Sequence, residues 1–397
     1  MEVLRQASPL ERAYIDGNVA IYFYFTLDDH FKQKAFEHAV AIVLRRHPFL
    51  RSALNDDVFI EKDVISPTDH ITQIVELPTN GEQFSYALDS SSLFHLYVAP
   101  QEDLSTDCLL VLHHAIADVT SGIALIEDLV RGLVSPEIPQ TSLPVHTSIE
   151  TFFPYCPTQP EIESYASSFH NSRAYPATCV LPVTEPAVPF EQTSLIEKEV
   201  VLRKDLFDRL KTAAKKNKVS RHALLTSILL HAIPDHIERT SVCVGTVVDM
   251  KRRLLEGRSC RDLFSGPLIS TSFIDLNGQD PAWTTAEKYA GALAAKIESP
   301  DIYRENYGII SEKVNLFLLG VSFFISDAGT IRFSNAAVQE LVTHLSFSSP
   351  LRLNCPYIMT TTYGNTVTLR IGHPTPWISE KTIDQYINRI SENLNQI

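Results

Sequence analysis

The stretch from Asp107 to Arg131, DCLLVLHHAIADVTSGIALIEDLVR, constrains the fold of this chain more than any other. Its five consecutive apolar residues, Cys108 to Leu112, predict a strand that is covered on both faces. From about Thr120 the apolar residues recur at helical spacing, and Thr120 or Ser121 is the expected N-cap. Two histidines and an aspartate therefore lie between a buried strand and a helix, where a rigid backbone can direct them into a cleft.

The three polar residues of this junction are His113, His114 and Asp118. Adjacent residues of a strand point to opposite faces, so both histidines cannot line one cavity. This counts against a two-histidine metal site, and it favours a single general base. Asp118 either fixes the tautomer of a histidine ring or forms a buried ion pair that holds the turn. The alternative is two ordinary core or surface histidines beside an acidic residue at a helix start.

The length and the proline distribution predict two halves. A chain of 397 residues exceeds what one hydrophobic core usually serves, which favours two domains or a pseudo-symmetric pair. Ten of the 23 prolines lie between Pro136 and Pro189, a density that excludes helix interiors and central strands. We therefore expect an N-terminal half at 1–175, a C-terminal half at 176–397 and a proline-rich crossover at 136–195.

Composition narrows the class of protein. Hydrophobic residues make up 44% and charged residues 20%, as in ordinary globular proteins. The net charge of -13 counts against a general nucleic-acid or anionic membrane surface. The six cysteines are scattered without a CxxC pair, no apolar run has membrane length, and no signal-peptide core is visible. These features predict a cytoplasmic protein without a membrane span.

Several other elements follow from periodicity and turn chemistry. The expected strands are Val19–Leu27, Leu93–Ala99, Glu197–Leu202 and Ser241–Val248. The expected helices are Phe31–His47, Lys204–Lys216, a helix from Ser220 to near Pro234, and Ser379–Leu394. A hairpin is expected to turn at Gly364–Asn365, and a turn at Ser326–Gly329 is expected to follow the apolar segment Leu316–Ile325.

A basic cluster follows the predicted strand Ser241–Val248. After Asp249 come Lys251, Arg252 and Arg253. A cation at the end of a strand is a candidate ion-pair partner for Asp118.

Five stretches, taken in order, resemble the condensation-domain, BAHD and chloramphenicol-acetyltransferase superfamily of HHxxxD acyltransferases. They are RRHPFLRS (Arg45–Ser52), HHAIAD (His113–Asp118), VGTVVDMKRRL (Val244–Leu254), FFISDAGTI (Phe323–Ile331) and the C-terminal stretch Tyr363–Ile390. The resemblance spans essentially the whole chain, and HHAIAD is its most specific part. It is closest to polyketide-associated acyltransferases and alcohol acetyltransferases.

This resemblance implies an α/β fold of two pseudo-symmetric chloramphenicol-acetyltransferase-like halves, with mixed β-sheets flanked by helices and an active-site tunnel at their interface. Such a fold can be complete as a monomer. The implied activity moves an acyl group from acyl-CoA or an acyl carrier protein to a small-molecule alcohol or amine, in secondary or lipid metabolism. The thioester is a co-substrate, and no bound cofactor or metal is expected.

The resemblance also implies roles for residues. His114 is the general base, without a covalent intermediate, and His113 supports it. Asp118 is structural and pairs with a basic residue of the second half, which is Lys251 unless Arg252 or Arg253 replaces it. The oxyanion donor is either a backbone N–H near Gly122 or a group at Ser326, and the sequence leaves both open.

The chain departs from the superfamily pattern at several positions. Lys251 stands where arginine is usual, Val119 where glycine is usual and Asp327 where asparagine is frequent, and the plant-type DFGWG motif is absent. Lysine keeps the charge but loses the bidentate fork. These departures leave an alternative, a condensation-like binding, docking or cyclisation module that has lost acyl transfer. A hydrolase is a third option, although no GxSxG nucleophile motif supports it.

Overall fold

The computed structural model of the chain describes residues 2–62, 65–77, 88, 91–135, 141–171, 188–189, 192–233, 241–255, 262–276, 280–314, 321–350 and 353–397. The chain forms two compact units. Unit 1 comprises 1–153, 249–267 and 330–350, and unit 2 comprises 154–248, 268–329 and 351–397. Unit 1 therefore combines an N-terminal segment with two later ones. The half boundary at residues 175 and 176 stays a prediction.

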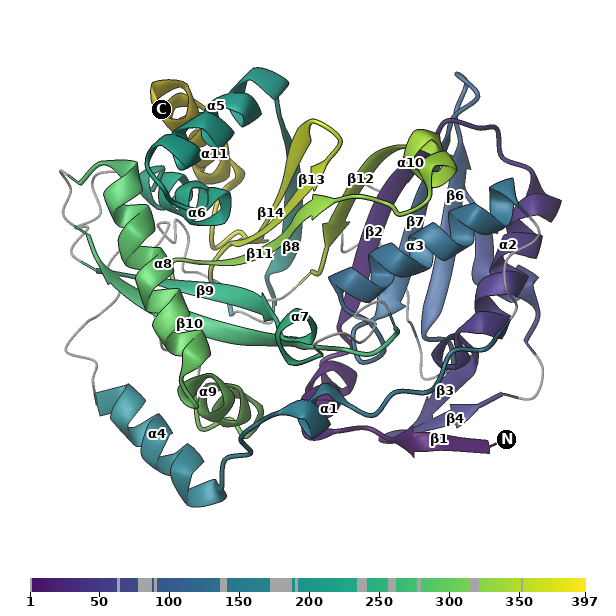
Figure 1. Ribbon diagram of the computed structural model, residues 1–397, viewed down its shortest axis with the longest axis horizontal. Coiled ribbons are helices and arrows are strands. Elements are labelled where there is room, and N and C mark those ends of the chain that lie inside the picture. Colours follow the sequence, from purple (N-terminus) through teal and green to yellow (C-terminus); the bar gives the residue numbers. More distant parts are fainter. Residues whose placement is uncertain are drawn as a thin grey trace. The chain divides into compact units, whose positions relative to one another are not determined.

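Unit 1 is built on a five-stranded mixed sheet of order β12-β2-β7-β6-β5, which Figure 1 shows from one face. Neighbouring strands are antiparallel except β5 and β6, which are parallel. The buried residues of the two central strands form the middle of the core. The strands are β2 (Ala20–Leu27), β5 (Ile71–Gln73), β6 (Phe94–Pro100), β7 (Thr106–His113) and β12 (Val342–Ser348).

Two long helices of unit 1, α2 (Gln33–Arg46) and α3 (Val119–Val134), pack together along one face of this sheet (Figure 1). A smaller antiparallel sheet has the order β1-β4-β3. The remaining elements of unit 1 are β1 (Glu2–Gln6), α1 (Pro9–Asp16), η1 (Pro48–Arg51), β3 (Ser52–Asn55), β4 (Val58–Glu61), η2 (Pro67–His70), η4 (Ile149–Phe152), α7 (Lys251–Leu254) and α10 (Ala336–Leu341).

Unit 2 contains a six-stranded mixed sheet of order β10-β9-β11-β13-β14-β8. Strands β9 and β11 are parallel, whereas β13, β14 and β8 are successively antiparallel. Helices α5, α6, α8 and α11 enclose one large apolar core with this sheet. The elements are α4 (Gln159–Asn171), β8 (Ser194–Leu202), α5 (Lys204–Lys216), α6 (Arg221–His231), β9 (Ser241–Asp249), β10 (Pro267–Asp275), α8 (Ala282–Glu298), α9 (Asp301–Ile310), β11 (Phe323–Ile331), β13 (Tyr357–Tyr363), β14 (Thr366–Thr375) and α11 (Glu380–Gln396).

The predicted fold class is confirmed, because both units consist of mixed sheets flanked by helices. The strongly patterned elements are also confirmed. The hairpin pairs Tyr363 with Thr366 across Gly364–Asn365. The side chain of Ser220 caps α6, and Ser379 caps α11.

Three local predictions are corrected. The N-cap of α3 is Asp118, not Thr120 or Ser121, because Asp118 and Ser121 form a capping box. Ser326–Gly329 is not a turn, since β11 continues through it to Ile331. The proline-rich crossover contains helix α4, with Pro160 near its first turn, where proline is tolerated. Residues 172–187 of the crossover and Leu316–Gly320 lie outside the described residues.

Helix α3 approaches β2 closely at Gly122. A Cβ atom added there would lie 2.1 Å from Cζ of Phe23, which is fully buried. We expect Gly122→Ala to lower the free energy of unfolding by about 1–3 kcal/mol through overpacking. The measurement is urea unfolding followed by circular dichroism.

Gly291→Ala is the matched control, because Gly291 lies on the exposed side of helix α8 with nothing within 4 Å of the added methyl group. It is expected to stabilise the chain by up to about 1 kcal/mol through helix propensity. Equal stability of the two variants would contradict the close contact at Gly122.

Candidate active site

Strand β7 ends in a tight turn that fixes both histidines. The backbone N–H of His114 donates to the carbonyl of Val19, the residue before β2, at 2.8 Å, and that of Ile116 donates to the carbonyl of His113 at 3.0 Å. The apolar residues Ala115, Ile116 and Ala117 are fully buried. The turn is thus anchored by the core, so the histidine side chains leave a rigid backbone.

His113 turns into the fold, where its side chain is 2% exposed. Its Nδ1 atom accepts a hydrogen bond from the backbone N–H of Ala115 at 3.1 Å. Burial lowers the pKa of His113 to about 4, helped by the neighbouring His114. The ring is therefore neutral, and its remaining proton is on Nε2. His113 has the features of a residue that shapes the turn.

The ring of His114 is half-buried and lies flat against the ring of Tyr14, with centroids 4.2 Å apart and planes 3° from parallel. Its Nδ1 atom is 3.4 Å from Oγ of Ser265. Burial lowers the pKa of His114 to about 4, and the charge of Lys251 acts in the same direction, against backbone hydrogen bonds that raise it. The imidazole is therefore neutral at pH 7 and can accept a proton.

Asp118 uses its two carboxylate oxygens differently. Oδ1 accepts hydrogen bonds from the backbone N–H and the hydroxyl of Ser121, both at 2.9 Å, which caps helix α3. Oδ2 lies 3.1 Å from Nζ of Lys251 as an ion pair outside hydrogen-bonding angles. Of the two roles left open by the sequence, the carboxylate has the structural one, since both oxygens are engaged away from the histidine rings.

Lys251 is fully buried. Besides Asp118, its ammonium donates to the carbonyl of Asp262 at 3.0 Å and lies 4.0 Å from the centroid of the Phe264 ring. A guanidinium could bind the carboxylate through two N–H groups. The lysine ammonium makes one such contact and is stabilised in addition by a carbonyl and an aromatic face. Gly266 is needed beside the stem, because a Cβ there would lie 2.6 Å from Cγ of Lys251.

Arg252 has a different position from Lys251. Its side chain is 61% exposed and pairs with Asp249 at 3.2 Å. Asp249 also accepts a hydrogen bond from the hydroxyl of Thr120 at 2.8 Å, which links Asp249 to the first turn of α3. Lys251, rather than Arg252, is therefore the partner of Asp118.

The two candidate oxyanion groups lie in different units. The N–H of Gly122 already donates to the carbonyl of Asp118 at 2.9 Å, within helix α3. Ser326 lies on β11 in unit 2 and is buried. Its neighbour Asp327 accepts hydrogen bonds from Thr360 at 2.7 Å and from the backbone N–H of Gly329 at 2.8 Å, and its Oδ2 lies 3.1 Å from Nδ1 of His222. The oxyanion donor stays a prediction.

Sequence reasoning missed two residues at His114, Tyr14 and Ser265. Tyr14 lies on helix α1, a short segment that carries none of the motifs described above. Ser265 lies next to the glycine beside Lys251, in a region without a recognisable pattern. Two sequence features could have pointed to them: the helical character of Pro9–Asp16, and the dipeptide Ser265–Gly266.

Two general properties follow from the described residues. Among them, no group of three or more histidine, cysteine, aspartate or glutamate residues is arranged to hold a metal ion. No described helix is both long enough and apolar enough to span a membrane.

Comparisons with known proteins identify the fold. No protein-family model and no curated protein matches the sequence. Polyketide synthase associated protein 5 from Mycobacterium tuberculosis is 17% identical, with a TM-score of 0.73 over 100% of this chain and 99% of that one. The TRI3 trichothecene 15-O-acetyltransferase from Fusarium sporotrichioides is 14% identical, with a TM-score of 0.72 over 98% and 94% of the two chains.

A third similar structure is the EpoB cyclization-docking bidomain from Sorangium cellulosum. It is 13% identical, with a TM-score of 0.67 over 99% of this chain and 84% of that one. The chain therefore shares the fold of these three proteins. This confirms, at the level of the fold, the resemblance carried by the five sequence stretches.

The buried ion pair can be tested by removing one charge. Lys251→Met leaves the carboxylate of Asp118 buried without its cation, and we expect it to lower the free energy of unfolding by about 3–5 kcal/mol. The double variant Asp118→Asn with Lys251→Met removes both charges and keeps a capping side chain, so it is expected to be more stable than the single variant. Urea unfolding measures all three proteins.

Arg252→Met is the control, since it removes a neighbouring cation that is 61% exposed and should change stability by less than about 1 kcal/mol. If Lys251→Met were no more damaging than Arg252→Met, the buried pair would not stabilise the fold.

Proposed function

We propose that the chain is a thioester-dependent O- or N-acyltransferase in which His114 is the general base. The observation that carries this proposal is the state of His114, a neutral and half-buried imidazole at the end of a central strand. Its backbone is held by Val19 before β2 and by the core, and the buried Asp118–Lys251 pair fixes the turn beside it. A rigid neutral imidazole that is accessible on one side is suited to proton transfer.

The proposed reaction needs no covalent intermediate. His114 removes the proton from the hydroxyl or amine of the acceptor, whose oxygen or nitrogen then bonds to the thioester carbonyl carbon. The carbon–sulfur bond breaks, and the thiolate leaves with the electron pair and takes the proton back from the imidazolium. The products are an ester or amide and a free thiol. Acceleration comes from this proton transfer and from holding two substrates together.

The proposed substrates are a small-molecule alcohol or amine and an acyl-CoA or acyl carrier protein. Support comes from two similar structures, one an O-acetyltransferase and the other a polyketide synthase associated protein. The thioester is consumed as a co-substrate. A setting in secondary metabolism is part of the same proposal.

A second candidate is a binding, docking or cyclisation module that has lost acyl transfer. The likeness to a cyclization-docking bidomain favours it. The departures from the superfamily pattern at Val119 and Lys251 are weaker support for this second candidate. Val119 is simply the first residue of helix α3, and Lys251 still pairs with Asp118.

Acyl transfer can be tested by thiol release from a panel of acyl-CoAs of increasing length, with a mixed pool of alcohols and amines. We expect acceptor-dependent release, which His114→Ala reduces by about 10²–10⁴-fold through loss of the base. His95→Gln is the matched control, because His95 lies on strand β6, bonded to Thr72 and packed on Tyr97. It should retain the wild-type rate.

The outcomes separate the candidates. Release that does not depend on an acceptor indicates a hydrolase. No release with any CoA is followed by a carrier-loaded acyl substrate, and failure with that donor as well favours a module without acyl transfer. Equal rates for wild type and His114→Ala would exclude His114 as the base.

The pH dependence gives an independent prediction. Because the pKa of His114 is about 4 rather than 6.5, the base stays deprotonated in mildly acidic solution. We expect kcat/KM to stay nearly flat as the pH is lowered from 8 to about 5 and to fall near pH 4. Initial rates in overlapping buffers measure this, and a half-point near pH 6.5 would contradict it.

Stability must be followed in the same buffers. The pKa values of His113 and His114 are both lowered to about 4, so the unfolded chain binds more protons than the folded chain between about pH 4 and 6.5. The free energy of unfolding therefore decreases as the pH falls through this window. Circular dichroism at each pH distinguishes loss of the base from loss of the fold.

A further inference from the structure

A cavity of about 540 Å³ lies between helix α4 and the elements β10, α8 and α9. All of its lining residues belong to unit 2, whereas His114 belongs to unit 1. The volume is in the range of small-molecule sites, and none of the lining side chains takes part in the proposed reaction. One wall is a single face of α4, on which the lining residues recur at helical spacing.

Three aromatic rings form one end of the cavity. Tyr165 and Phe169 are one helical turn apart on α4, and their rings stack with centroids 5.5 Å apart. Phe273 of the edge strand β10 meets Phe169 edge-on at 6.0 Å and is 40% exposed. An exposed ring that continues a group of two others forms an open aromatic surface. The ring of a ligand would extend these stacked and edge-on contacts.

Charges of both signs form the other end of the cavity. Arg304 bonds to Asp301 at 2.9 Å and lies 3.6 Å from Glu161. Hydrogen bonds from Tyr155 and Thr158 lower the pKa of Glu161 to about 2, so this carboxylate is ionised. The three charged side chains remain accessible to a ligand, since they are 29–41% exposed.

Lys296 places a second cation beside the aromatic end. Its ammonium lies 5.0 Å from the centroid of the Tyr165 ring and 5.7 Å from that of Phe169. It pairs with Glu305 at 2.6 Å and donates to the hydroxyl of Tyr165. Among the described residues these are its two hydrogen-bonding partners, so one of the three N–H donors of the ammonium remains for a ligand.

We propose that this cavity binds an aromatic amino acid in its zwitterionic form. The lining carries two cations and two carboxylates, so a ligand with one charge of each sign finds a partner for both. The ligand carboxylate is assigned to Arg304 and Lys296, and its ammonium to Asp301. The aromatic side group is assigned to the rings around Phe273. A ligand with a single charge would also face lining groups of its own sign, which weakens its binding. This binding needs no acyl transfer and goes beyond the proposed function.

The wall opposite α4 is rigid. The carboxylate of Glu305 is fully buried, and its Oε1 atom accepts from the backbone N–H and the hydroxyl of Thr271, at 3.0 and 2.5 Å. The side-chain amide of Asn306 bonds to both backbone groups of Ile269, at 2.8 and 2.7 Å. Two side chains of α9 therefore take the place of a neighbouring strand along the edge of β10. A preformed wall lowers the cost of ordering the site when a ligand binds.

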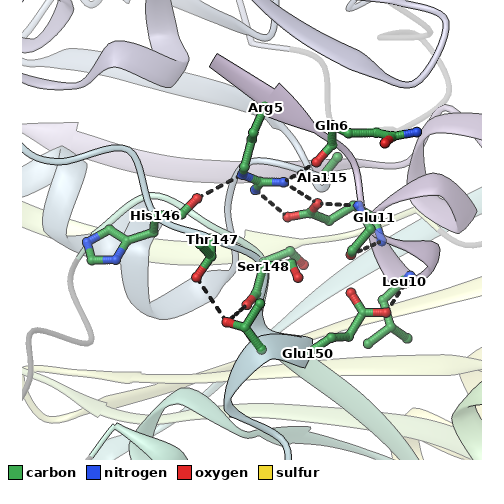
Figure 2. Close-up of polar contacts among 12 residues, drawn as sticks. Arg5, Gln6, Leu10, Glu11, Ala115, His146, Thr147, Ser148 and Glu150 are labelled. Carbon is green, nitrogen blue, oxygen red and sulfur yellow. Dashed lines mark hydrogen bonds and ion pairs between the residues drawn. The ribbon is translucent and has the colours of Figure 1, made fainter. Parts of the chain in front are cut away.

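The chain that leads into α4 is also held. In unit 1, the carbonyl of His146 accepts a hydrogen bond from the guanidinium of Arg5 at 2.8 Å, as Figure 2 shows. In unit 2, the hydroxyl of Tyr155 accepts from Nε of Arg304 at 3.2 Å, and the guanidinium lies 5.1 Å from the centroid of the Tyr155 ring. The α4 wall is therefore fixed to α9 just before the helix begins.

The binding test uses 4-fluoro-L-phenylalanine with the full chain, observed by ¹⁹F NMR. We expect line broadening that saturates, with a Kd on the order of 0.1–1 mM for a ligand of this size. L-Phenylalanine should displace the probe. Phenethylamine lacks the carboxylate and 3-phenylpropionate lacks the ammonium, so each is expected to bind at least about fivefold more weakly than L-phenylalanine.

Variants locate the site. Phe273→Ala removes the exposed ring and is expected to weaken probe binding by about three- to tenfold. Trp283→Ala is the matched control, because Trp283 is 42% exposed on α8 and does not line the cavity. Arg304→Gln should cause a similar loss to Phe273→Ala. Its control is Arg203→Gln, which removes a 72% exposed arginine that pairs with Asp205.

His114→Ala distinguishes the cavity from the candidate active site, where an amine could bind as an acceptor. It should bind the probe as tightly as the wild type. Loss of binding in a folded His114→Ala protein would overturn the proposal. So would unchanged binding in Phe273→Ala, equal affinity for the three ligands, or no saturable broadening up to about 10 mM probe. If circular dichroism shows that Arg304→Gln does not fold, Phe273→Ala and the three ligands decide the question.

Discussion

The charge of Lys251 is the constraint on which the arrangement of unit 1 depends. A fully buried ammonium is tolerated only when its lost hydration is replaced, here by the carboxylate of Asp118, the carbonyl of Asp262 and the face of Phe264. Together with Lys251 itself, these groups come from three separate parts of the sequence. Satisfying one cation therefore fixes the start of helix α3, the end of β9 and the segment 262–266 together. The turn that carries His114 is held in place by these contacts around Lys251.

The sequence predicted much of the framework because its strongest patterns are local. The apolar run before His113 and the helical spacing after it led to β7 and α3. The basic cluster after β9 predicted a cation for Asp118, and the family resemblance placed it at Lys251 with Arg252 and Arg253 as alternatives. In contrast, the contacts of Tyr14 and Ser265 with His114 depend on long-range packing, which no periodicity encodes. The capping role of Asp118 was hidden for a related reason, since two hydroxyl residues nearby fitted the same pattern.

The substitution of lysine for the usual arginine can be understood from the surroundings of Lys251. A guanidinium recognises a carboxylate through two parallel bonds, whereas an ammonium is a point charge that accepts partners from several directions. In this chain Phe264 lies against the ammonium and Gly266 against the stem. The pocket is thus complementary to a lysine. An arginine at position 251 would bring its larger head group against the ring of Phe264, which already contacts the ammonium.

Unit 1 is made of segments that lie far apart in the sequence, and this affects how it can fold while the chain is being synthesised. Its sheet is completed by β12, which pairs with β2 although more than three hundred residues separate them, and its buried cation comes from residue 251. During synthesis, the segments that form β2, β7 and α3 leave the ribosome long before β12 and residue 251. The nascent N-terminal segment must wait with one sheet edge open and Asp118 without its counter-charge, a state that chaperones are suited to protect. The turn that carries His114 is therefore translated early, but its surroundings are complete only after Lys251 and β12 have been translated.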